Sequence, residues 1–269
     1  MQQFLVYLMA LLMGVVLGIT GGGGSILTVP VLVYLAGVGV VTATGYSLFI
    51  VGVTAFAGTL SYIRQGFVNF RAALVFALPS VVAVFFMRKV VVPLIPQKLF
   101  CFGNLLITKD LVLMAAFVLL MLITAVSMLS TIKKEETIQT NTIFHFRLIA
   151  TQGFSVGILT GLLGAGGGFI IVPALVLLAN LPIRFAVGTS LLVITINALV
   201  GFLGDFLNAS QTDWQLLLSF SGVGILGVFV GSYFSKFIAA PKLKAGFGYF
   251  LLVMAAYIIV NEVKKLFNS

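Results

Sequence analysis

The stretch Gly18-Ile-Thr-Gly-Gly-Gly-Gly-Ser25, which precedes Pro30 by five residues, lies inside an apolar part of the chain. A related stretch, Gly161-Leu-Leu-Gly-Ala-Gly-Gly-Gly168, precedes Pro173 in the same way. Each glycine weakens a helix by about 1 kcal/mol relative to alanine, and in hydrocarbon every backbone group released from a helix needs another partner. The two stretches therefore predict broken or re-entrant helices, whose bare N–H groups face a ligand or one another.

The composition around these stretches indicates a membrane protein. Of the 269 residues, 61% are hydrophobic and 8% are charged, whereas soluble domains carry about 25% charged residues. Several apolar segments of 17 or more residues contain no Asp, Glu, Lys or Arg, as expected for helices that span a bilayer. We predict an all-α, multi-pass membrane protein that is embedded in the lipid bilayer.

The chain contains an internal duplication. When the sequence is shifted by 143 residues, residues 14–63 align with residues 157–206 without a gap, and 18 of the 50 positions are identical. The matches pair Gly18 with Gly161, Pro30 with Pro173, and Ser47 with Ser190, among others. Apolar composition alone would produce chance Leu and Val matches, but it would not keep glycine, proline and serine in register. With one extra residue, Asn69-Phe70 also matches Asp213-Trp214.

The duplication divides the chain into two homologous halves with about eight transmembrane helices in total. Residues 1–130 form the first transmembrane repeat, residues 131–147 a polar linker that contains the only histidine, His145, and residues 148–269 the second repeat. Parallel and inverted halves are both compatible with the pattern. The basic connectors, formed by Arg88, Lys89, Lys98 and Lys109 and by Lys236, Lys242 and Lys244, favour parallel halves under the positive-inside rule.

Several classes of function are disfavoured by what the chain lacks. The formal charge of +9 comes from Lys and Arg residues between apolar segments, where lipid headgroups and topology explain them without nucleic acid. Cys101 is the only cysteine, so neither an intrachain disulfide nor a thiolate metal site is expected. No paired-carboxylate or Ser-His-Asp arrangement occurs in the apolar segments. We therefore expect a protein that is not an enzyme and that uses no metal or cofactor.

The glycine stretches are candidate anion sites, because N–H groups at a helix N-terminus and the helix dipole both favour negative charge. Hydroxyl groups of Thr20 and Ser25 would add donors in the first copy only, since Leu163 and Gly168 occupy the matching positions. The alternative is close helix packing through small residues, although consecutive glycines unwind a helix. The candidate backbone ligands are Gly21, Gly22, Gly23, Gly24, Gly164, Gly166, Gly167 and Gly168.

The helix after each break offers uncharged hydrogen-bond donors at bilayer depth. Ser47 and Ser190 are preserved by the repeat, and Asn197 follows in the second half. Such side chains suit a small oxyanion, but serine in membrane helices also bonds to its own backbone or to a neighbouring helix. Asp205 is the carboxylate nearest the interior of an apolar segment, which makes it a candidate proton relay or an interfacial residue.

The two motifs resemble the duplicated signature of the sulfite exporter TauE/SafE family of membrane permeases. The resemblance rests on the two glycine stretches with their prolines and on the Ala-x-Gly-x-Ser sequences at Ala43–Ser47 and Ala186–Ser190. It covers nearly the whole chain. It implies a transporter, in the bacterial inner membrane, of a small sulfur-containing anion such as sulfite or sulfoacetate, with a coupling proton as a further candidate partner.

The resulting hypothesis is a secondary transporter, working as an exporter, that holds the anion between the two glycine breaks by alternating access. A passive anion channel with the same pore is one alternative. A membrane scaffold or partner subunit with glycine-packed helices is another. The substrate, the direction of transport and the oligomeric state, including a homodimer, stay open at the level of the sequence.

Overall fold

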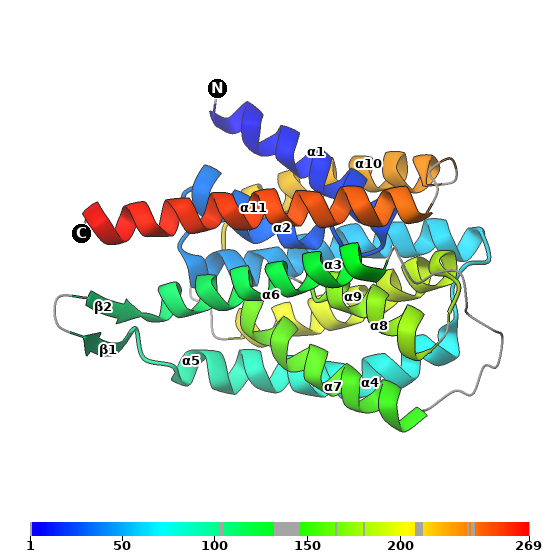
Figure 1. Ribbon diagram of the computed structural model, residues 1–269, viewed down its shortest axis with the longest axis horizontal. Coiled ribbons are helices and arrows are strands. Elements are labelled where there is room, and N and C mark those ends of the chain that lie inside the picture. Colours follow the sequence, from blue (N-terminus) through cyan, green and yellow to red (C-terminus); the bar gives the residue numbers. More distant parts are fainter. Residues whose placement is uncertain are drawn as a thin grey trace.

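The computed structural model describes residues 2–102, 105–131, 146–164, 166–179, 181–207, 212–235, 237 and 240–268. The central part of the linker predicted at residues 131–147, including His145, lies outside the described residues. The described chain is chiefly helical, and most of its helices run side by side along the long axis of the molecule (Figure 1).

The first half forms five helical regions and one hairpin. In chain order these are α1 (Gln2–Thr20), α2 (Ser25–Pro30) with a π-helical extension (Val31–Leu35), α3 (Val40–Arg64), α4 (Phe70–Phe86) with a second π-helical segment (Met87–Val91) and α5 (Val92–Leu94), the strands β1 (Lys98–Phe102) and β2 (Leu105–Thr108), and α6 (Lys109–Thr131). A short antiparallel hairpin, β1–β2, precedes α6, and the rest of the described elements are helices, as predicted from the sequence.

The second half repeats the helical order without a described hairpin. Its elements are α7 (Phe146–Leu163), α8 (Gly168–Leu178), α9 (Ile183–Phe206), α10 (Trp214–Phe234) and α11 (Ala240–Asn268). In each half a long helix, α1 or α7, stops at a glycine stretch, and a short helix, α2 or α8, begins on its far side.

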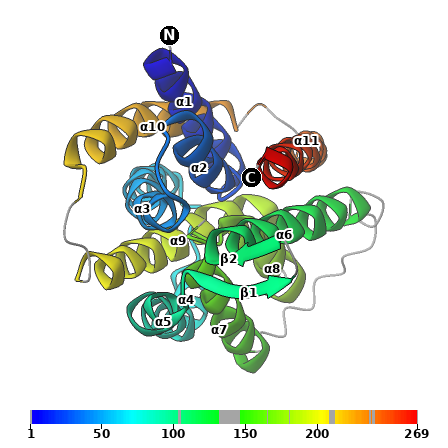
Figure 2. The same cartoon turned by 90° about the vertical axis from the view of Figure 1, so that its left-hand side faces the viewer.

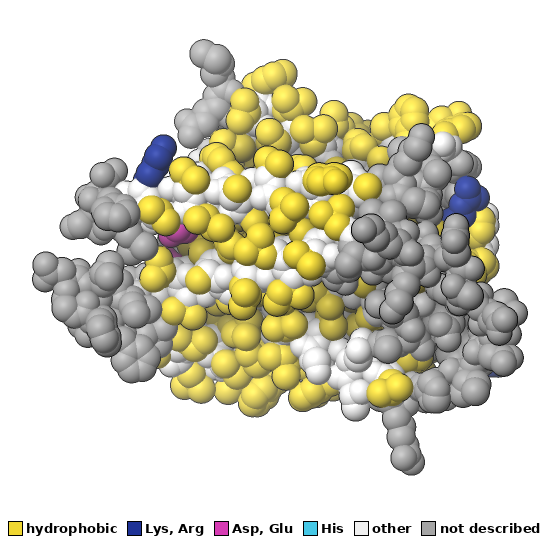
Figure 3. Space-filling model, viewed as in Figure 1, with side chains coloured by type: hydrophobic (Ala, Val, Ile, Leu, Met, Phe, Trp, Pro, Cys, Tyr) yellow, Lys and Arg dark blue, Asp and Glu magenta, His cyan; other side chains and the backbone are white. Residues whose placement is uncertain are grey.

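Long apolar helices dominate the described residues. Five of them are long and apolar enough to cross a membrane: Val40–Arg64, Phe70–Leu94, Lys109–Val126, Ile183–Phe206 and Trp214–Phe234. Shorter apolar helices cover Phe4–Thr20, Ser25–Leu35 and Leu148–Leu163. Hydrophobic side chains cover the middle of the face seen in Figure 3, and the coloured charged side chains lie toward its two ends. This distribution matches a protein whose sides contact lipid.

The matching elements of the two halves pack against each other in a regular pattern. α1 packs along α10, and α7, the counterpart of α1, packs along α4, the counterpart of α10. α3 packs along its own counterpart α9, and α6 along α11. Figure 2 shows these pairs around the bundle, with α1 and α10 on one side, α4 and α7 on another, and α6 and α11 on a third. Each of these pairs therefore joins a helix of one half to a helix of the other half.

The two halves are inverted with respect to each other. Gly52 of α3 lies against Leu199 of α9, whereas Gly58, further along α3, lies against Leu191, which is earlier in α9. The two equivalent helices are therefore antiparallel. The preference for parallel halves is wrong, because it counted Arg88 and Lys109 as connector charges, and both are buried.

Glycine allows the paired helices to approach closely. A Cβ atom at Gly14 of α1 would overlap the backbone of Gly224 in α10, and one at Gly157 of α7, the counterpart of Gly14, would overlap the backbone of Ser80 in α4. Such contacts through small residues are the usual way in which helices associate in lipid. Gly14 and Gly157, which precede the two glycine stretches, therefore serve close helix packing.

Polar residues begin two equivalent helices. The side chain of Asn69 accepts a hydrogen bond from the N–H of Ala72 over 3.0 Å at the start of α4. Asp213 accepts one from the N–H of Leu216, also over 3.0 Å, at the start of α10. The repeated polar pair found in the sequence is thus a pair of N-caps.

Candidate functional site

The first glycine break joins α1 to α2. Gly21 adopts a φ of 73°, which favours glycine, and all residues from 21 to 30 are buried. The hydroxyl of Thr20 donates to the carbonyl of Val16 and accepts from the N–H of Gly23 over 2.8 Å. The hydroxyl of Ser25 donates to the carbonyl of Gly22 over 2.6 Å. Both hydroxyl groups therefore stabilise the turn between the helices.

The second break joins α7 to α8 and has a different backbone. Gly164, Gly166 and Gly167 adopt φ values of 68°, 66° and 68°, so each position strongly favours glycine. A Cβ atom at Gly167 would overlap the hydroxyl oxygen of Thr160, which has no hydrogen-bond partner among the described residues. The two breaks are therefore unequal in both chemistry and conformation.

The two breaks contact each other through their backbones. A Cβ atom at Gly22 would overlap the backbone of Gly168, and a Cβ atom at Gly168 would overlap the Cα atom of Gly22. Only residues without a side chain allow this approach. The structure thus brings the first and second glycine stretches together, although they are more than 140 residues apart in the sequence.

Each break also lies against the middle helix of the opposite half. A Cβ atom at Gly21 would lie 2.6 Å from the Cα of Val187 in α9, and one at Gly164 would lie 2.6 Å from the Cβ of Thr44 in α3. Val187 and Thr44 are equivalent positions of the repeat. The inverted symmetry therefore extends to individual contacts around the breaks.

Ser47 and Ser190, which occupy equivalent positions of the repeat, differ in their hydrogen bonds. Ser190 donates to the carbonyl of Gly21 across 2.5 Å and to that of Val187 across 2.7 Å. Ser47 is fully buried, and its hydroxyl has no partner among the described residues. Asn197 lies further along α9 and donates to the hydroxyl of Ser80 in α4 over 2.6 Å. Asn197 therefore joins α9 to α4, and no described contact joins it to a glycine break.

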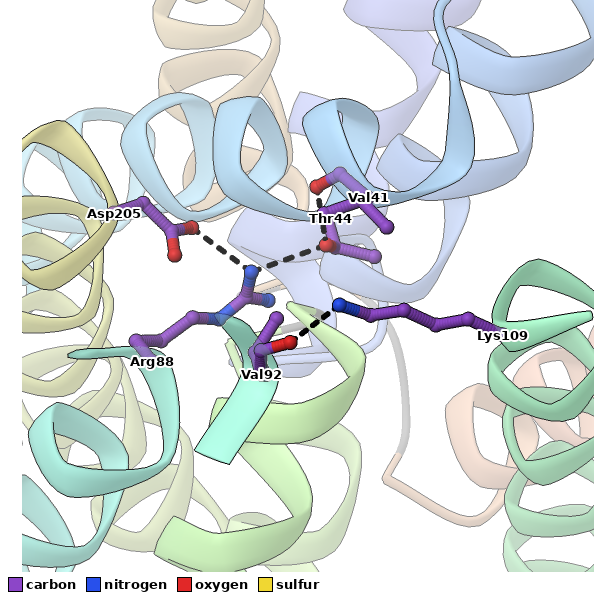
Figure 4. A network of polar contacts seen from close by, with 6 residues as sticks. All are labelled: Val41, Thr44, Arg88, Val92, Lys109 and Asp205. Atoms are coloured by element: carbon purple, nitrogen blue, oxygen red, sulfur yellow. Dashed lines mark hydrogen bonds and ion pairs between the residues drawn. The ribbon is translucent and has the colours of Figure 1, made fainter. Parts of the chain in front are cut away.

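The most polar cluster in the interior centres on Arg88, in the π-helical segment between α4 and α5. Its Nη1 donates to Oδ2 of Asp205 over 2.8 Å and to the hydroxyl of Thr44 over 3.1 Å (Figure 4). The Arg88 side chain is 0% exposed, and that of Asp205 is 23% exposed. Asp205, predicted as a proton relay or an interfacial residue, is thus the ion-pair partner of a buried arginine.

Arg88 is the residue that the sequence interpretation missed, because it was assigned to a basic connector. The apolar run from Val90 to Ile95 follows Arg88-Lys89 directly, and the structure places Arg88 well inside the span Phe70–Leu94. That apolar run was the signal in the sequence that Arg88 belongs to a membrane helix, since a connector would not return to apolar sequence within one helical turn. Helical segments with π geometry occur often at functional sites.

Three glycines and a lysine surround this ion pair. A Cβ atom at Gly45 would lie 2.7 Å from Oδ2 of Asp205, one at Gly164 would lie 2.5 Å from Nη2 of Arg88, and one at Gly204 would lie 3.1 Å from the Cβ of Arg88. Lys109 of α6 is 5% exposed and donates from Nζ to the carbonyl of Val92 (Figure 4). The cluster therefore adjoins the second break.

The two positions of the repeat that correspond to this ion pair carry no charge. Tyr62 matches Asp205, and Ser232 matches Arg88 when the extra residue is counted. The hydroxyl of Tyr62 donates to the carbonyl of Gly18 over 2.9 Å and contacts Ser235, and Ser232 contacts Ser61 over 3.1 Å. The Arg88–Asp205 ion pair thus has two neutral side chains as its counterpart in the repeat, and Arg184 acts electrostatically on one of them, Tyr62. Among the described residues, no group of three His, Cys, Asp or Glu side chains could hold a metal ion.

Comparisons with known proteins agree with this architecture. The family model described as "Sulfite exporter TauE/SafE" matches residues 6–258. A "Probable membrane transporter protein" of Xylella fastidiosa (strain Temecula1) is 32% identical over 255 residues, which cover 92% of this chain and 91% of the relative. The "Probable membrane transporter protein YdhB" of Bacillus subtilis is 28% identical over 244 residues, covering 90% of this chain and 94% of the relative. No solved structure matches the chain.

The family match covers nearly the full length of the chain, including the positions of both glycine breaks and of the Arg88–Asp205 pair. The resemblance seen in the two glycine motifs is therefore confirmed, and the apolar helices agree with a multi-pass membrane protein. The chain belongs to the sulfite exporter TauE/SafE family, a family of membrane transporters.

Proposed function

We propose that the protein is a secondary transporter, working as an exporter, of a small sulfur-containing anion such as sulfite or sulfoacetate. The observation that carries the proposal is the backbone contact between Gly22 and Gly168. Inverted repeats with broken helices meeting between them are the architecture in which transporters bind substrate and alternate between the two membrane faces.

The proposed site lies where the two breaks meet. Gly22, Gly24, Gly166, Gly167 and Gly168 would supply backbone N–H groups, and Ser47 would supply a hydroxyl group. The predicted donors Gly21, Gly23 and Gly164 already bond through their N–H groups to Leu17, Thr20 and Thr160. Ser190 would join the site only on releasing the carbonyls to which it donates. Ser47 supports this assignment, because a buried hydroxyl without a partner is costly and a bound oxyanion would accept its hydrogen bond. Thr20 and Ser25 would shape the turn, and Asn197 would hold α9 against α4.

A carrier is favoured over a passive channel. The first break, including Gly22, is buried and contacts the second break directly, so the middle of the molecule is closed. Transport would then require the two halves to move apart at one face and together at the other. The coupling proton is assigned to Asp205, because it lies beside a buried cation at the second break and is partly exposed.

The test is the flux of ³⁵S-sulfite in proteoliposomes that contain Gly22→Ala, Gly168→Ala or the wild-type protein. Each substitution places a methyl group between the breaks, so flux per folded protein should fall sharply. Gly222→Ala is the matched control, because nothing lies within 4 Å of its added Cβ. Wild-type flux in Gly22→Ala and Gly168→Ala protein that elutes as a folded species would refute the assigned site.

The kinetics separate the proposed carrier from its alternatives. A carrier gives saturable uptake that speeds up when unlabelled sulfite is present on the opposite side, whereas a passive channel shows no such stimulation. A wild-type protein that moves neither sulfite nor sulfoacetate would support the scaffold alternative. The expected result is saturable, trans-stimulated flux.

A further inference from the structure

We infer that the side-on edge of the Arg88 guanidinium, formed by Nε and Nη2, binds the transported oxyanion at the second glycine break, with Asp205 positioning Arg88 for this contact. The inference rests on the proposed function for the identity of the anion. It assigns the binding charge to a residue that lies outside both glycine motifs.

The first argument is the set of unused donors on Arg88. A guanidinium group has five N–H donors and no acceptor. Asp205 and Thr44 both bond to Nη1, while Nε and Nη2 have no partner among the described residues, although the side chain is 0% exposed. Burying charged donors without acceptors is costly. A ligand that accepts from both atoms would remove that cost.

The second argument is geometric. Nε and Nη2 lie on the same edge of the planar group, and their two N–H bonds are nearly parallel, which is the arrangement that binds two oxygen atoms of one oxyanion. Because Asp205 occupies the other terminal nitrogen, a bound anion would not have to displace it. Asp205 is thus a positioning residue, and the unused edge is the binding group.

The third argument is location. Nη2 lies beside Gly164, where an added Cβ would be 2.5 Å from this nitrogen. The φ of 68° at Gly164 also favours glycine. A bare Cα atom at this point lets the backbone of the second break and the guanidinium approach the same small ligand. Ser47, whose counterpart Ser190 bonds to the first break, belongs to the helix that contacts Gly164.

The fourth argument is charge. Lys109 is also buried near Arg88, and its ammonium group bonds to the Val92 carbonyl instead of a carboxylate. Its sequence neighbour Asp110 is half-buried, and Asp205 is bonded to Arg88. The interior near the second break thus holds two cations, of which one is paired with a carboxylate, and an anion would be attracted there.

The inverted repeat also predicts one such site per chain. At the equivalent end, Tyr62 and Ser232 replace Asp205 and Arg88 and bond to neutral partners. This pair lacks a guanidinium at the position of Arg88, and Arg184 at the start of α9 is the cation that acts electrostatically on Tyr62. The pair therefore provides a matched control within the same molecule.

The experiment measures sulfite binding to the purified full-length protein by isothermal titration calorimetry. Arg88→Lys keeps the positive charge but lacks the two-donor edge, and we expect sulfite to bind at least about tenfold more weakly, as for the loss of a charge-assisted pair of hydrogen bonds. Tyr62→Phe, at the position equivalent to Asp205, should bind sulfite like the wild type.

A second variant guards against misfolding. Removing Arg88 alone would leave Asp205 buried without its partner, whereas Arg88→Gln combined with Asp205→Asn removes both charges and keeps a similar shape. This double variant should fold and should lose sulfite binding. Wild-type affinity in the folded double variant or in Arg88→Lys would overturn the inference, and so would a wild-type protein that does not bind sulfite.

The flux assay distinguishes this failure from failure of the proposed function. If Arg88→Lys and the double variant retain both binding and saturable sulfite flux, the transporter proposal stands and the Arg88 assignment is wrong. If the wild type binds sulfite in an Arg88-dependent way but shows no flux, the binding site stands and the transport proposal is wrong.

Discussion

The hydroxyl of Ser190 donates a hydrogen bond to the carbonyl of Gly21 across 2.5 Å, so the middle helix of the second half holds the first glycine break in place. Its repeat counterpart Ser47 makes no such bond among the described residues. In the state that the structure describes, the two halves are therefore held unequally. An exchange of these roles between Ser47 and Ser190 is what an inverted repeat would produce on changing from one facing state to the other.

We predict that Ser190→Ala lowers the stability of the protein by about 1 kcal/mol, because it leaves the buried Gly21 carbonyl without this donor. Ser47→Ala should change the stability by less than about 0.5 kcal/mol, since the hydroxyl it removes has no partner. Thermal unfolding of both variants in the same detergent measures the difference. Equal losses of stability would show that the two serines contribute alike.

We predict that Gly227→Leu disrupts the packing of α1 on α10. An added Cβ at Gly227 would overlap the carbonyl of Leu11 and lie 3.0 Å from the Cα of Gly14, and overpacking of this kind costs about 1–3 kcal/mol. The apparent melting temperature should fall. Gly222→Ala, on an open face of the same helix, should leave it unchanged, and a matching loss in that control would argue against a packing cause.

We predict that Asp205→Asn destabilises the protein by about 3–5 kcal/mol, because it leaves the buried Arg88 guanidinium without its carboxylate. The double variant Arg88→Gln/Asp205→Asn should recover most of this loss, since neither charge remains to be desolvated. A double-mutant cycle of unfolding free energies gives the coupling between the two residues. Strictly additive effects of the two substitutions would mean that the contact contributes no coupling.

We predict that the start of α3 and the end of α9 lie on the same face of the membrane. In a background where Cys101 is replaced by serine, a cysteine at Gly39 and one at Leu207 should react with a membrane-impermeant maleimide from one side. A cysteine at Gly66, just after α3, should react from the opposite side. Parallel halves would instead place positions 66 and 207 on one face, so the labelling pattern distinguishes the two arrangements.

Much of the architecture could be predicted from the sequence because it depends on local composition. Long apolar segments with few charges choose a bilayer over water whatever their neighbours are. Consecutive glycines favour the end of a helix wherever they occur. The match between Gly18–Pro30 and Gly161–Pro173 shows the duplication and the family without any coordinates. The predicted count of eight crossings is not confirmed: five helices in the described part of the chain are long enough to span, and two equal inverted halves need an odd number of crossings each, whereas eight would give four.

The tertiary structure decided how these parts combine. The antiparallel arrangement of α3 and α9, the contact of Gly22 with Gly168, and the burial of Arg88 beside Asp205 all join residues more than a hundred positions apart. A hydrophobic pattern identifies which segments enter the membrane, but it does not encode which face of one helix packs on which face of another. Arg88 looked like a connector charge because its counter-ion lies on a distant helix, and only packing shows that the two charges meet.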